Sequence, residues 1–180
     1  MRRAVFLDRD GVLNRSVVRD GTPEPPRGQD DVEILPGVPR ACAELRAAGF
    51  ALVVVTNQPE IARGTLTRQA VDAINSVLSA SLRLDEIVVC PHDDGDGCDC
   101  RKPRPGMLLD AAGRHGIDLE HSYLVGDRWR DIGAGHAAGV RTVFVDRGYD
   151  ERRPEKPDAV VGDLTEATVW ILEDATKTTL

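Results

Sequence analysis

The sequence predicts an α/β fold built on a Rossmann-like, doubly wound parallel sheet. Along its 180 residues, short runs rich in Val, Leu and Phe alternate with segments whose apolar residues recur at helical spacing. The short runs are continuously apolar, as expected for strands that are covered on both faces. Strands and helices that alternate in this order are typical of a parallel sheet with a layer of helices on each side.

Each expected element has its own local signal. Strands are expected at residues 4–7, 51–55, 87–89, 123–125 and 142–145, with a short edge strand at 159–161. The first helix is expected where apolar residues fall at i, i+3, i+4 and i+7, namely Val38, Ala41, Cys42 and Leu45, and it should end at Gly49. Further helices are expected behind a Thr67 cap, from Pro105 to His115, from Arg130 to Ala138, and near 164–172.

Two stretches interrupt this alternation within one expected domain, which spans residues 1–180. Residues 14–36 contain Pro23, Pro25 and Pro26, and a loop of this length in a compact domain is usually a functional lid or a disordered segment. We interpret it as a specificity loop. The second stretch, at 90–102, holds three cysteines and a histidine.

Composition excludes several classes of protein. The chain is 41% apolar and 29% charged, as in soluble globular proteins. Its net charge of −7 argues against a general binder of nucleic acid or of an anionic membrane. The first apolar run, at residues 4–7, is shorter than the roughly 7–15 apolar residues of a secretory signal. We therefore expect a cytoplasmic protein with reduced thiols, and a monomer, because no long apolar face is left over.

Polar residues stand where the expected strands end. Asp8 and Asp10 follow the first strand, Thr56 and Asn57 follow the second, and Asp127 follows the strand at 123–125. The carboxyl ends of parallel strands lie at one edge of the sheet, where such folds bind ligands. One such aspartate alone would be an ordinary surface acid, but the whole set predicts a site.

This set predicts phosphoryl chemistry assisted by a metal. Clustered carboxylates need a cation, and hard oxygen ligands suit Mg²⁺, which also accepts substrate phosphate. One aspartate can then attack phosphorus, while a second protonates the leaving alkoxide and later activates water. Lys102 and the hydroxyl of Thr56 are the expected donors to the phosphoryl oxygens.

The same residues resemble the motifs of the haloacid dehalogenase superfamily of phosphohydrolases. Asp8-Arg9-Asp10-Gly11-Val12-Leu13-Asn14 resembles the first motif and Thr56-Asn57-Gln58 the second. Lys102 resembles the third motif, and Gly126-Asp127 with Asp131 the fourth. The four motifs occur in the family's order and cover nearly the whole chain.

That resemblance assigns a role to each of these residues. It implies that Asp8 is the nucleophile and Asp10 the general acid and base. It also implies that Asp8, the backbone carbonyl of Asp10 and Asp127 hold Mg²⁺, with Asp131 supporting the metal site through water or by orienting Lys102. Larger members insert a cap domain after the first or second motif, and neither gap here is long enough to hold one. We therefore expect a capless fold with an open sheet edge.

Three cysteines and a histidine suggest a second metal. Cys90, His92, Cys98 and Cys100 provide the ligand set of a closed structural zinc site, which would order a loop with few apolar residues. A redox Cys-x-Cys pair and unliganded thiols remain as alternatives. Cys42 lies on an apolar stripe and is interpreted as packing.

The cysteine pattern narrows the resemblance to one branch. Cys-x-His, a loop, and Cys-x-Cys-Arg-Lys-Pro resemble the D-glycero-D-manno-heptose 1,7-bisphosphate 7-phosphatases and the related histidinol-phosphate phosphatases. The resemblance implies a small phosphorylated substrate, for which we predict the heptose 1,7-bisphosphate, cleaved at C7, with histidinol phosphate or another small sugar phosphate as the alternative. Two alternatives come from other classes, a zinc-stapled binding module without turnover and a receiver-like phospho-acceptor domain. The first predicts that a catalytic residue is missing, and the second gives no reason for Asp10 or the cysteines.

Candidate substrate contacts come from the cationic residues near the expected edge. Arg101 and Arg128 are implied by the resemblance, and arginine suits bidentate contacts to phosphate. Weaker candidates are Asn57, Gln58 and Arg63. The long loop adds three arginines that could also contact substrate, although ordinary solvated side chains are the simpler interpretation: Arg15, Arg19 and Arg27.

Overall fold

The computed structural model describes residues 1–19 and 22–177. A six-stranded sheet runs through the molecule in the order β5-β4-β1-β6-β7-β8, with every neighbouring pair parallel. Its strands are β1 (Ala4–Leu7), β4 (Ala51–Asn57), β5 (Glu86–Cys90), β6 (Tyr123–Gly126), β7 (Arg141–Val145) and β8 (Ala159–Val161). This is the strand order of a doubly wound fold, and the direction of winding reverses between β1 and β6.

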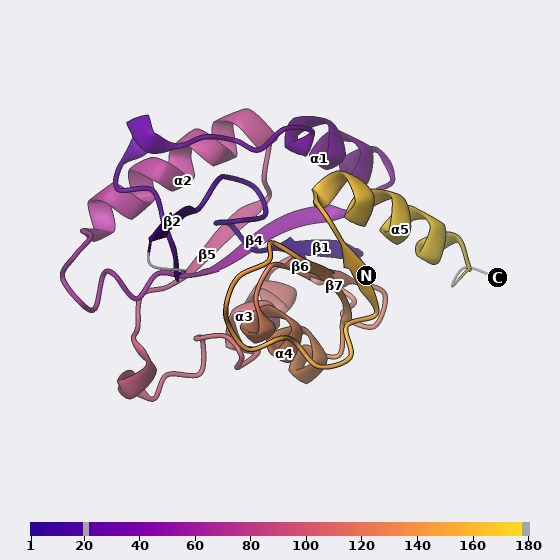
Figure 1. Ribbon diagram of the computed structural model, residues 1–180. Coiled ribbons are helices and arrows are strands. Elements are labelled where there is room, and N and C mark those ends of the chain that lie inside the picture. Colours follow the sequence, from indigo (N-terminus) through magenta and orange to yellow (C-terminus); the bar gives the residue numbers. More distant parts are fainter. Residues whose placement is uncertain (20–21, 178–180) are drawn as a thin grey trace.

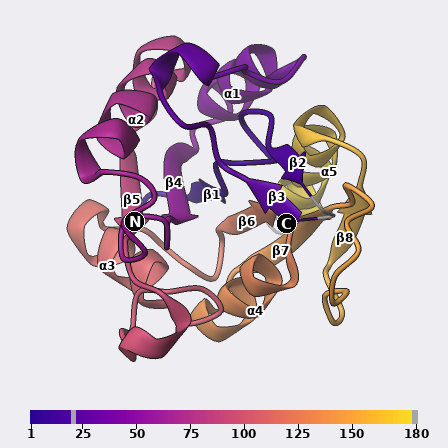
Figure 2. The ribbon, with the colours of Figure 1, turned by 60° about the vertical axis from the view of Figure 1, so that its left-hand side comes forward.

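Helices cover both faces of the sheet, as the continuously apolar strands predict (Figure 1; Figure 2). One face carries α1 (Val38–Ala47), α2 (Arg68–Leu82) and α5 (Leu164–Lys177), and the other carries α3 (Gly106–His115) and α4 (Trp129–Ala138). Successive residues of β1 alternate between the two cores. Val5 and Leu7 pack with the first group of helices, whereas Ala4 and Phe6 pack with the second.

The local signals for helix ends are confirmed at several positions. Thr67 caps α2, since its hydroxyl accepts a hydrogen bond of 3.1 Å from the backbone of Ala70. Gly116 and Gly139 take the left-handed conformation after α3 and α4. Helix α5 continues five residues beyond the expected end at 172, because no glycine or proline follows there to break it.

The stretch at 14–36 contains structure that the sequence reading missed. It forms a small antiparallel hairpin, β2 (Val17–Arg19) and β3 (Thr22–Glu24), followed by a single 3-10 turn, η1 (Gln29–Asp31). Pro23 argued against a strand, but a proline is tolerated in a two-stranded ribbon where one side of each strand is unpaired. The described residues of the segment therefore hold a hairpin and a turn, and Ser16, Glu24, Pro25 and Arg27 from this segment line a cavity at the edge of the sheet. No helix in the described part of the chain is long and apolar enough to cross a bilayer.

Candidate active site

The candidate site lies at the carboxyl ends of β1, β4 and β6, next to the point where the winding reverses. Asp8 follows β1, Thr56 is near the end of β4 and Asp127 follows β6, and all three are buried. Thr56 and Asn57 belong to the strand itself, which runs two residues further than expected and pairs there with β5. A cavity of about 640 Å³ opens beside them, lined by all the residues proposed from the sequence for catalysis or magnesium and by the proposed substrate contacts outside the 14–36 loop.

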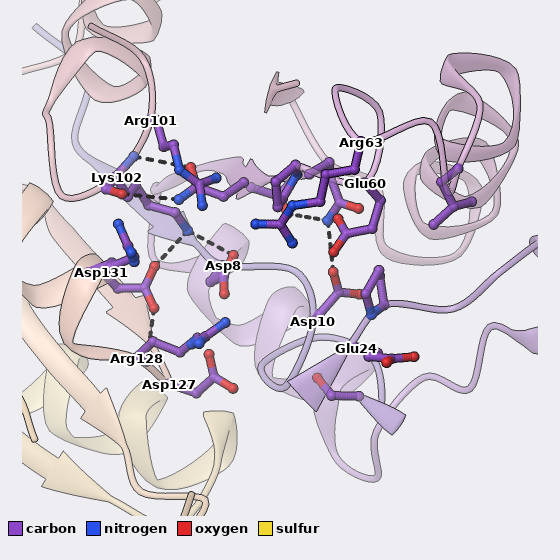
Figure 3. A pocket seen from close by; sticks show the side chains of 18 of the residues that line it. Asp8, Asp10, Glu24, Glu60, Arg63, Arg101, Lys102, Asp127, Arg128 and Asp131 are labelled. Atoms are coloured by element: carbon purple, nitrogen blue, oxygen red, sulfur yellow. Dashed lines mark hydrogen bonds and ion pairs between the residues drawn. The ribbon is translucent and has the colours of Figure 1, made fainter. Parts of the chain in front are cut away.

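Lys102 connects two of the acidic residues (Figure 3). Its ammonium lies 2.8 Å from Oδ1 of Asp8 and 2.6 Å from Oδ1 of Asp131, and it donates to the backbone carbonyl of Val55 at 2.7 Å. Burial alone would lower the pKa of this lysine, but the two carboxylates raise it above its ordinary value. Lys102 is therefore a fixed positive charge next to the expected nucleophile.

Asn57 holds the backbone of this lysine. Its side-chain amide donates to the carbonyl of Lys102 and accepts from its N–H, both at 3.1 Å. Asn57 was expected as a substrate contact, and it lines the cavity, but its amide group is engaged with the chain itself. Its direct effect in this structure is to position Lys102.

Asp10 lies on the other side of the cavity, near Glu60, as Figure 3 shows. Its Oδ2 accepts from Gln58 at 2.8 Å and its Oδ1 from Asn14 at 2.9 Å. The amide of Gln58 also donates to the hydroxyl of Thr56 at 2.9 Å. Gln58, expected as a substrate contact, thus joins the second motif to Asp10.

The carboxylate of Asp127 fits a ligand for a cation. Both of its oxygens are buried, and the only group found to approach them as a hydrogen-bond donor within the described residues is the hydroxyl of Tyr149. Burial raises its pKa well above the ordinary range, and the charges of Asp8 and Asp131 raise it further. Burial likewise raises the pKa of Asp8 to about 6. A divalent cation between Asp8 and Asp127 would favour the ionised form of both carboxylates and so offset the effect of their burial, and the residues therefore fit Mg²⁺.

Asp131 is close to this pair but its oxygens are already engaged. One oxygen from each of Asp8, Asp127 and Asp131 lies within 4.8 Å of the others. Oδ1 of Asp131 contacts Lys102, while Oδ2 accepts from the backbone N–H of Arg128 at 3.0 Å. This geometry favours the expectation that Asp131 orients Lys102.

The four residues of the second candidate metal site converge at the end of β5. The sulfur of Cys100 lies 3.1 Å from that of Cys90 and 3.5 Å from that of Cys98, and 3.3 Å from Nδ1 of His92. These separations are far longer than the roughly 2.05 Å of a disulfide. They approach the ~3.8 Å expected between thiolates around one tetrahedral zinc with Zn–S bonds of about 2.3 Å. Three sulfurs and one imidazole therefore fit a zinc ion.

The candidate arginines are held by acidic residues that the sequence reading did not single out. Arg63 makes two contacts to Asp93, at 2.6 and 2.7 Å, and Arg101 donates to Asp94 at 2.8 Å. Arg130 also contacts Asp94, at 3.0 Å. Asp93 and Asp94 lie between His92 and Cys98 of the cysteine and histidine cluster, where Asp94 begins the 3-10 turn η2 (Asp94–Asp96). The loop with the cysteines thus arranges the positive charges at the mouth of the cavity.

The remaining arginines differ in their relation to the cavity. Arg128 lines it and is held by Glu151 through two contacts, at 2.8 and 2.6 Å. Arg27 lines it as well, whereas Arg15 is paired with Glu33 at the surface. The side chain of Arg19 lies outside the described part of the structure.

One further residue near the metal position was missed. A side chain at Gly11, where φ is +87°, would place its Cβ 1.9 Å from Oδ2 of Asp127 and 3.0 Å from the hydroxyl of Tyr149. Tyr149 therefore approaches Asp127 beside the first motif, and burial, followed by the charge of Asp127, raises its pKa. No motif includes this tyrosine, and the loop after β7 brings it here.

Comparisons with known proteins agree with this site. Residues 99–167 match a family model described as HAD-hydrolase-like. The chain is 40% identical to a D-glycero-beta-D-manno-heptose-1,7-bisphosphate 7-phosphatase of Yersinia pestis, over 94% of this chain and 89% of that protein. It is 41% identical to the protein of the same name from Escherichia coli K12, over 87% and 85%.

The fold is also similar to that of a solved structure. The D,D-heptose 1,7-bisphosphate phosphatase of B. bronchiseptica, crystallised with magnesium and phosphate, superposes with a TM-score of 0.82. It is 34% identical in sequence, and the match covers 96% of this chain and 99% of that one. The similarity therefore extends over the complete sheet and both of its helix layers.

Proposed function

Since this chain belongs to the haloacid dehalogenase-like hydrolases, we propose that it is a Mg²⁺-dependent phosphatase that forms an aspartyl-phosphate on Asp8. We propose D-glycero-D-manno-heptose 1,7-bisphosphate as its substrate, cleaved at C7. One observation carries the chemistry: the Asp8 carboxylate is held 2.8 Å from Lys102, beside the buried carboxylate of Asp127, which no cationic side chain contacts among the described residues.

The first half of the proposed reaction transfers the phosphoryl group to the enzyme. An oxygen of Asp8 bonds to phosphorus as the bond from phosphorus to the sugar oxygen breaks. Protonated Asp10 gives its proton to that departing oxygen, so an alcohol leaves. Lys102 stays in place next to the developing charge on the phosphoryl oxygens, and the hydroxyl of Thr56 is a second donor there.

The second half returns the enzyme to its starting state. Asp10, now a carboxylate, takes a proton from a water molecule while the water oxygen bonds to phosphorus. The bond from phosphorus to Asp8 breaks, inorganic phosphate leaves, and both aspartates regain their original form. When bound by Asp8, Asp127 and the carbonyl of Asp10, Mg²⁺ would neutralise the phosphoryl oxygens and the nucleophile's own charge.

The substrate assignment is supported by the names of the relatives and by the shape of the site. A cavity of about 640 Å³ is much larger than one phosphate needs, and several arginines line its mouth. Arginines suit a second phosphate group, because each guanidinium can make two parallel contacts to it. We propose Arg63, Arg101 and Arg128 as the substrate contacts and the segment 14–36 as the specificity loop.

We also propose that Cys90, His92, Cys98 and Cys100 bind a structural zinc ion that orders the loop at 90–102. The convergence of their ligand atoms within 4.8 Å supports this. None of the four cysteines, all of which lie in the described residues, forms a disulfide, which supports a cytoplasmic location. A single-domain monomer acting on a small phosphorylated substrate completes the proposal.

The test combines one variant with a substrate panel. Asp8→Asn should abolish turnover with the fold intact, whereas Asp110→Asn, on the exposed face of α3, should leave it unchanged. Appreciable activity of Asp8→Asn would mean another nucleophile. Among the two anomers of heptose 1,7-bisphosphate, histidinol phosphate and simpler sugar phosphates, kcat/KM should be highest for one heptose anomer. A higher value for histidinol phosphate would overturn the substrate assignment but leave the chemistry standing.

A further inference from the structure

We propose that Arg9 is a positioning residue, which holds the carboxyl group of Asp10 in the orientation needed for proton transfer and is itself held by Asn75. This inference rests on the proposed function, because there Asp10 is the proton donor. Arg9 stands between the two motif aspartates, but it does not line the cavity and has no role in the steps derived above.

The burial of Arg9 is the first observation. Its side chain is 0% exposed, and it is the largest of the fully buried side chains. A guanidinium carries a permanent charge, and its transfer out of water is unfavourable unless charged and polar partners surround it. The free-energy cost of burying this arginine must therefore be offset by specific contacts.

The hydrogen-bond partners of Arg9 provide these contacts. Its Nε donates to Oδ1 of Asp10 at 3.2 Å, and one terminal nitrogen donates to Oδ2 at 2.9 Å. The other terminal nitrogen donates to the side-chain oxygen of Asn75 at 2.9 Å. The planar guanidinium thus meets the Asp10 carboxylate along two parallel contacts, a geometry that fixes rotation as well as distance.

Each oxygen of Asp10 also has a second donor. Asn14 donates to Oδ1 and Gln58 to Oδ2, at 2.9 and 2.8 Å. Gln58 lines the cavity, whereas Asn14 and Arg9 are fully buried, and the Asp10 side chain remains 16% exposed. Each amide contacts one oxygen of Asp10, whereas the single guanidinium of Arg9 contacts both.

Asn75 links this arrangement to the core. It lies on α2 next to Ile74, and both Ile74 and Leu78 are fully buried in the packing of α2 on the sheet. The position of Arg9 is therefore set by a packed helix and not by a mobile loop. A displacement of about 1 Å at a reacting group can cost on the order of 100-fold in rate, so such an anchor has a direct catalytic consequence.

The experiment uses leaving groups that differ in their need for a proton. An alkyl phosphate needs its departing oxygen protonated, whereas p-nitrophenyl phosphate leaves as a stable anion without a donor. Because kcat/KM reports the step that forms the aspartyl-phosphate, we compare the alkyl-to-aryl ratio of kcat/KM. Asp10→Asn gives the reference value for complete loss of the proton donor.

The variants are graded by what they remove. Arg9→Met removes the charge and both parallel contacts, and should lower the alkyl-to-aryl ratio on the order of 10- to 100-fold, within the range of a general acid's contribution. Arg9→Lys keeps the charge but loses the planar fork, and should restore only part of the ratio. Asn75→Ala leaves Arg9 paired with Asp10 but removes its hydrogen bond to α2. This variant should lower the alkyl-to-aryl ratio less than Arg9→Met does. Arg46→Met is the matched control, because it removes an arginine from Asp85 far from the cavity and should leave the ratio unchanged.

The possible outcomes separate this inference from the proposed function. If the variants unfold at lower temperature while both substrates slow equally, Arg9 acts through packing alone and the inference is wrong. If Arg9→Met unfolds altogether, an unchanged ratio in Asn75→Ala or Arg9→Lys overturns it equally. If the wild-type protein hydrolyses neither of these phosphates nor heptose 1,7-bisphosphate, the proposed function itself fails. A selective loss of alkyl phosphate hydrolysis, partly rescued in Arg9→Lys, establishes the positioning role.

Discussion

The sharpest consequence of the site geometry concerns Lys102, whose ammonium group is shared by two buried carboxylates. The substitution Lys102→Met keeps most of the side-chain volume and removes the charge. It leaves Asp8 and Asp131 facing one another without the cation that separates them, and it leaves the carbonyl of Val55 without its donor. The effect should appear both in the reaction and in the stability of the fold.

The size of the effect of Lys102→Met on stability can be estimated from the contact distances. At 2.8 Å from Asp8, and an effective dielectric constant of about 20, the attraction is about 6 kcal/mol before the cost of burying both charges is subtracted. Breaking one partner out of a buried pair costs a net amount of about 3–5 kcal/mol in stability. For a chain of this size that lowers Tm by roughly 10 °C. Loss of one preorganised donor at a developing charge lowers kcat about 100- to 1000-fold.

The assay is thermal unfolding with and without Mg²⁺, followed by kinetics on the preferred substrate. Mg²⁺ should stabilise Lys102→Met more than it stabilises the wild-type protein, because the cation replaces the lost positive charge. Lys156→Met, at an exposed position outside the cavity, is the control and should change neither measurement. Activity of Lys102→Met within about threefold of wild type, with an unchanged Tm, would show that the observed contacts do not govern the reaction.

Two further predictions follow from the metal positions. Cys98→Ser should lower the zinc content and Tm together, by about 2–4 °C for each kcal/mol lost, and an unchanged zinc stoichiometry by elemental analysis would contradict the ligand assignment. Burial raises the pKa of Asp8 from 3.8 to about 6, so its ionised form is less favourable in the folded than in the unfolded protein. In the protein stripped of metal, stability should therefore fall as pH rises from about 4 to about 6, by about 3 kcal/mol from this group. Chemical denaturation across that range should show the fall in wild type and a smaller one in Asp8→Asn, and Mg²⁺ should reverse it, since it favours the ionised carboxylate.

Much of the fold could be predicted because the signals are local. Continuous apolarity marked the buried strands, and a capping threonine or a terminal glycine marked the helix ends. The aspartates could be placed together because the topology, and not their separation in sequence, determines where strand ends meet. The hairpin at β2 and β3 was missed because its short strands carry no alternating pattern.

The contacts that arrange the catalytic groups could not be predicted in the same way. Arg9 and Asn75 are 66 residues apart and meet only because α2 packs on the same face as the loop after β1. The acidic partners of the arginines also escaped notice, since Asp93 and Asp94 look like ordinary solvated residues of a polar loop. Charge pairing of this kind depends on side-chain direction, which neither periodicity nor spacing encodes.

The two hydrogen bonds between Asn57 and Lys102 fix the position of the lysine independently of the loop that precedes it. Asn57 is the last residue of β4, and its side-chain amide makes two hydrogen bonds to the backbone of Lys102. The position of the lysine is therefore set by the sheet. The loop at residues 93–97 can then be lengthened, shortened or replaced while Lys102 keeps its position relative to Asp8. Substrate range can in this way be altered at the entrance of the cavity, independently of the machinery behind it.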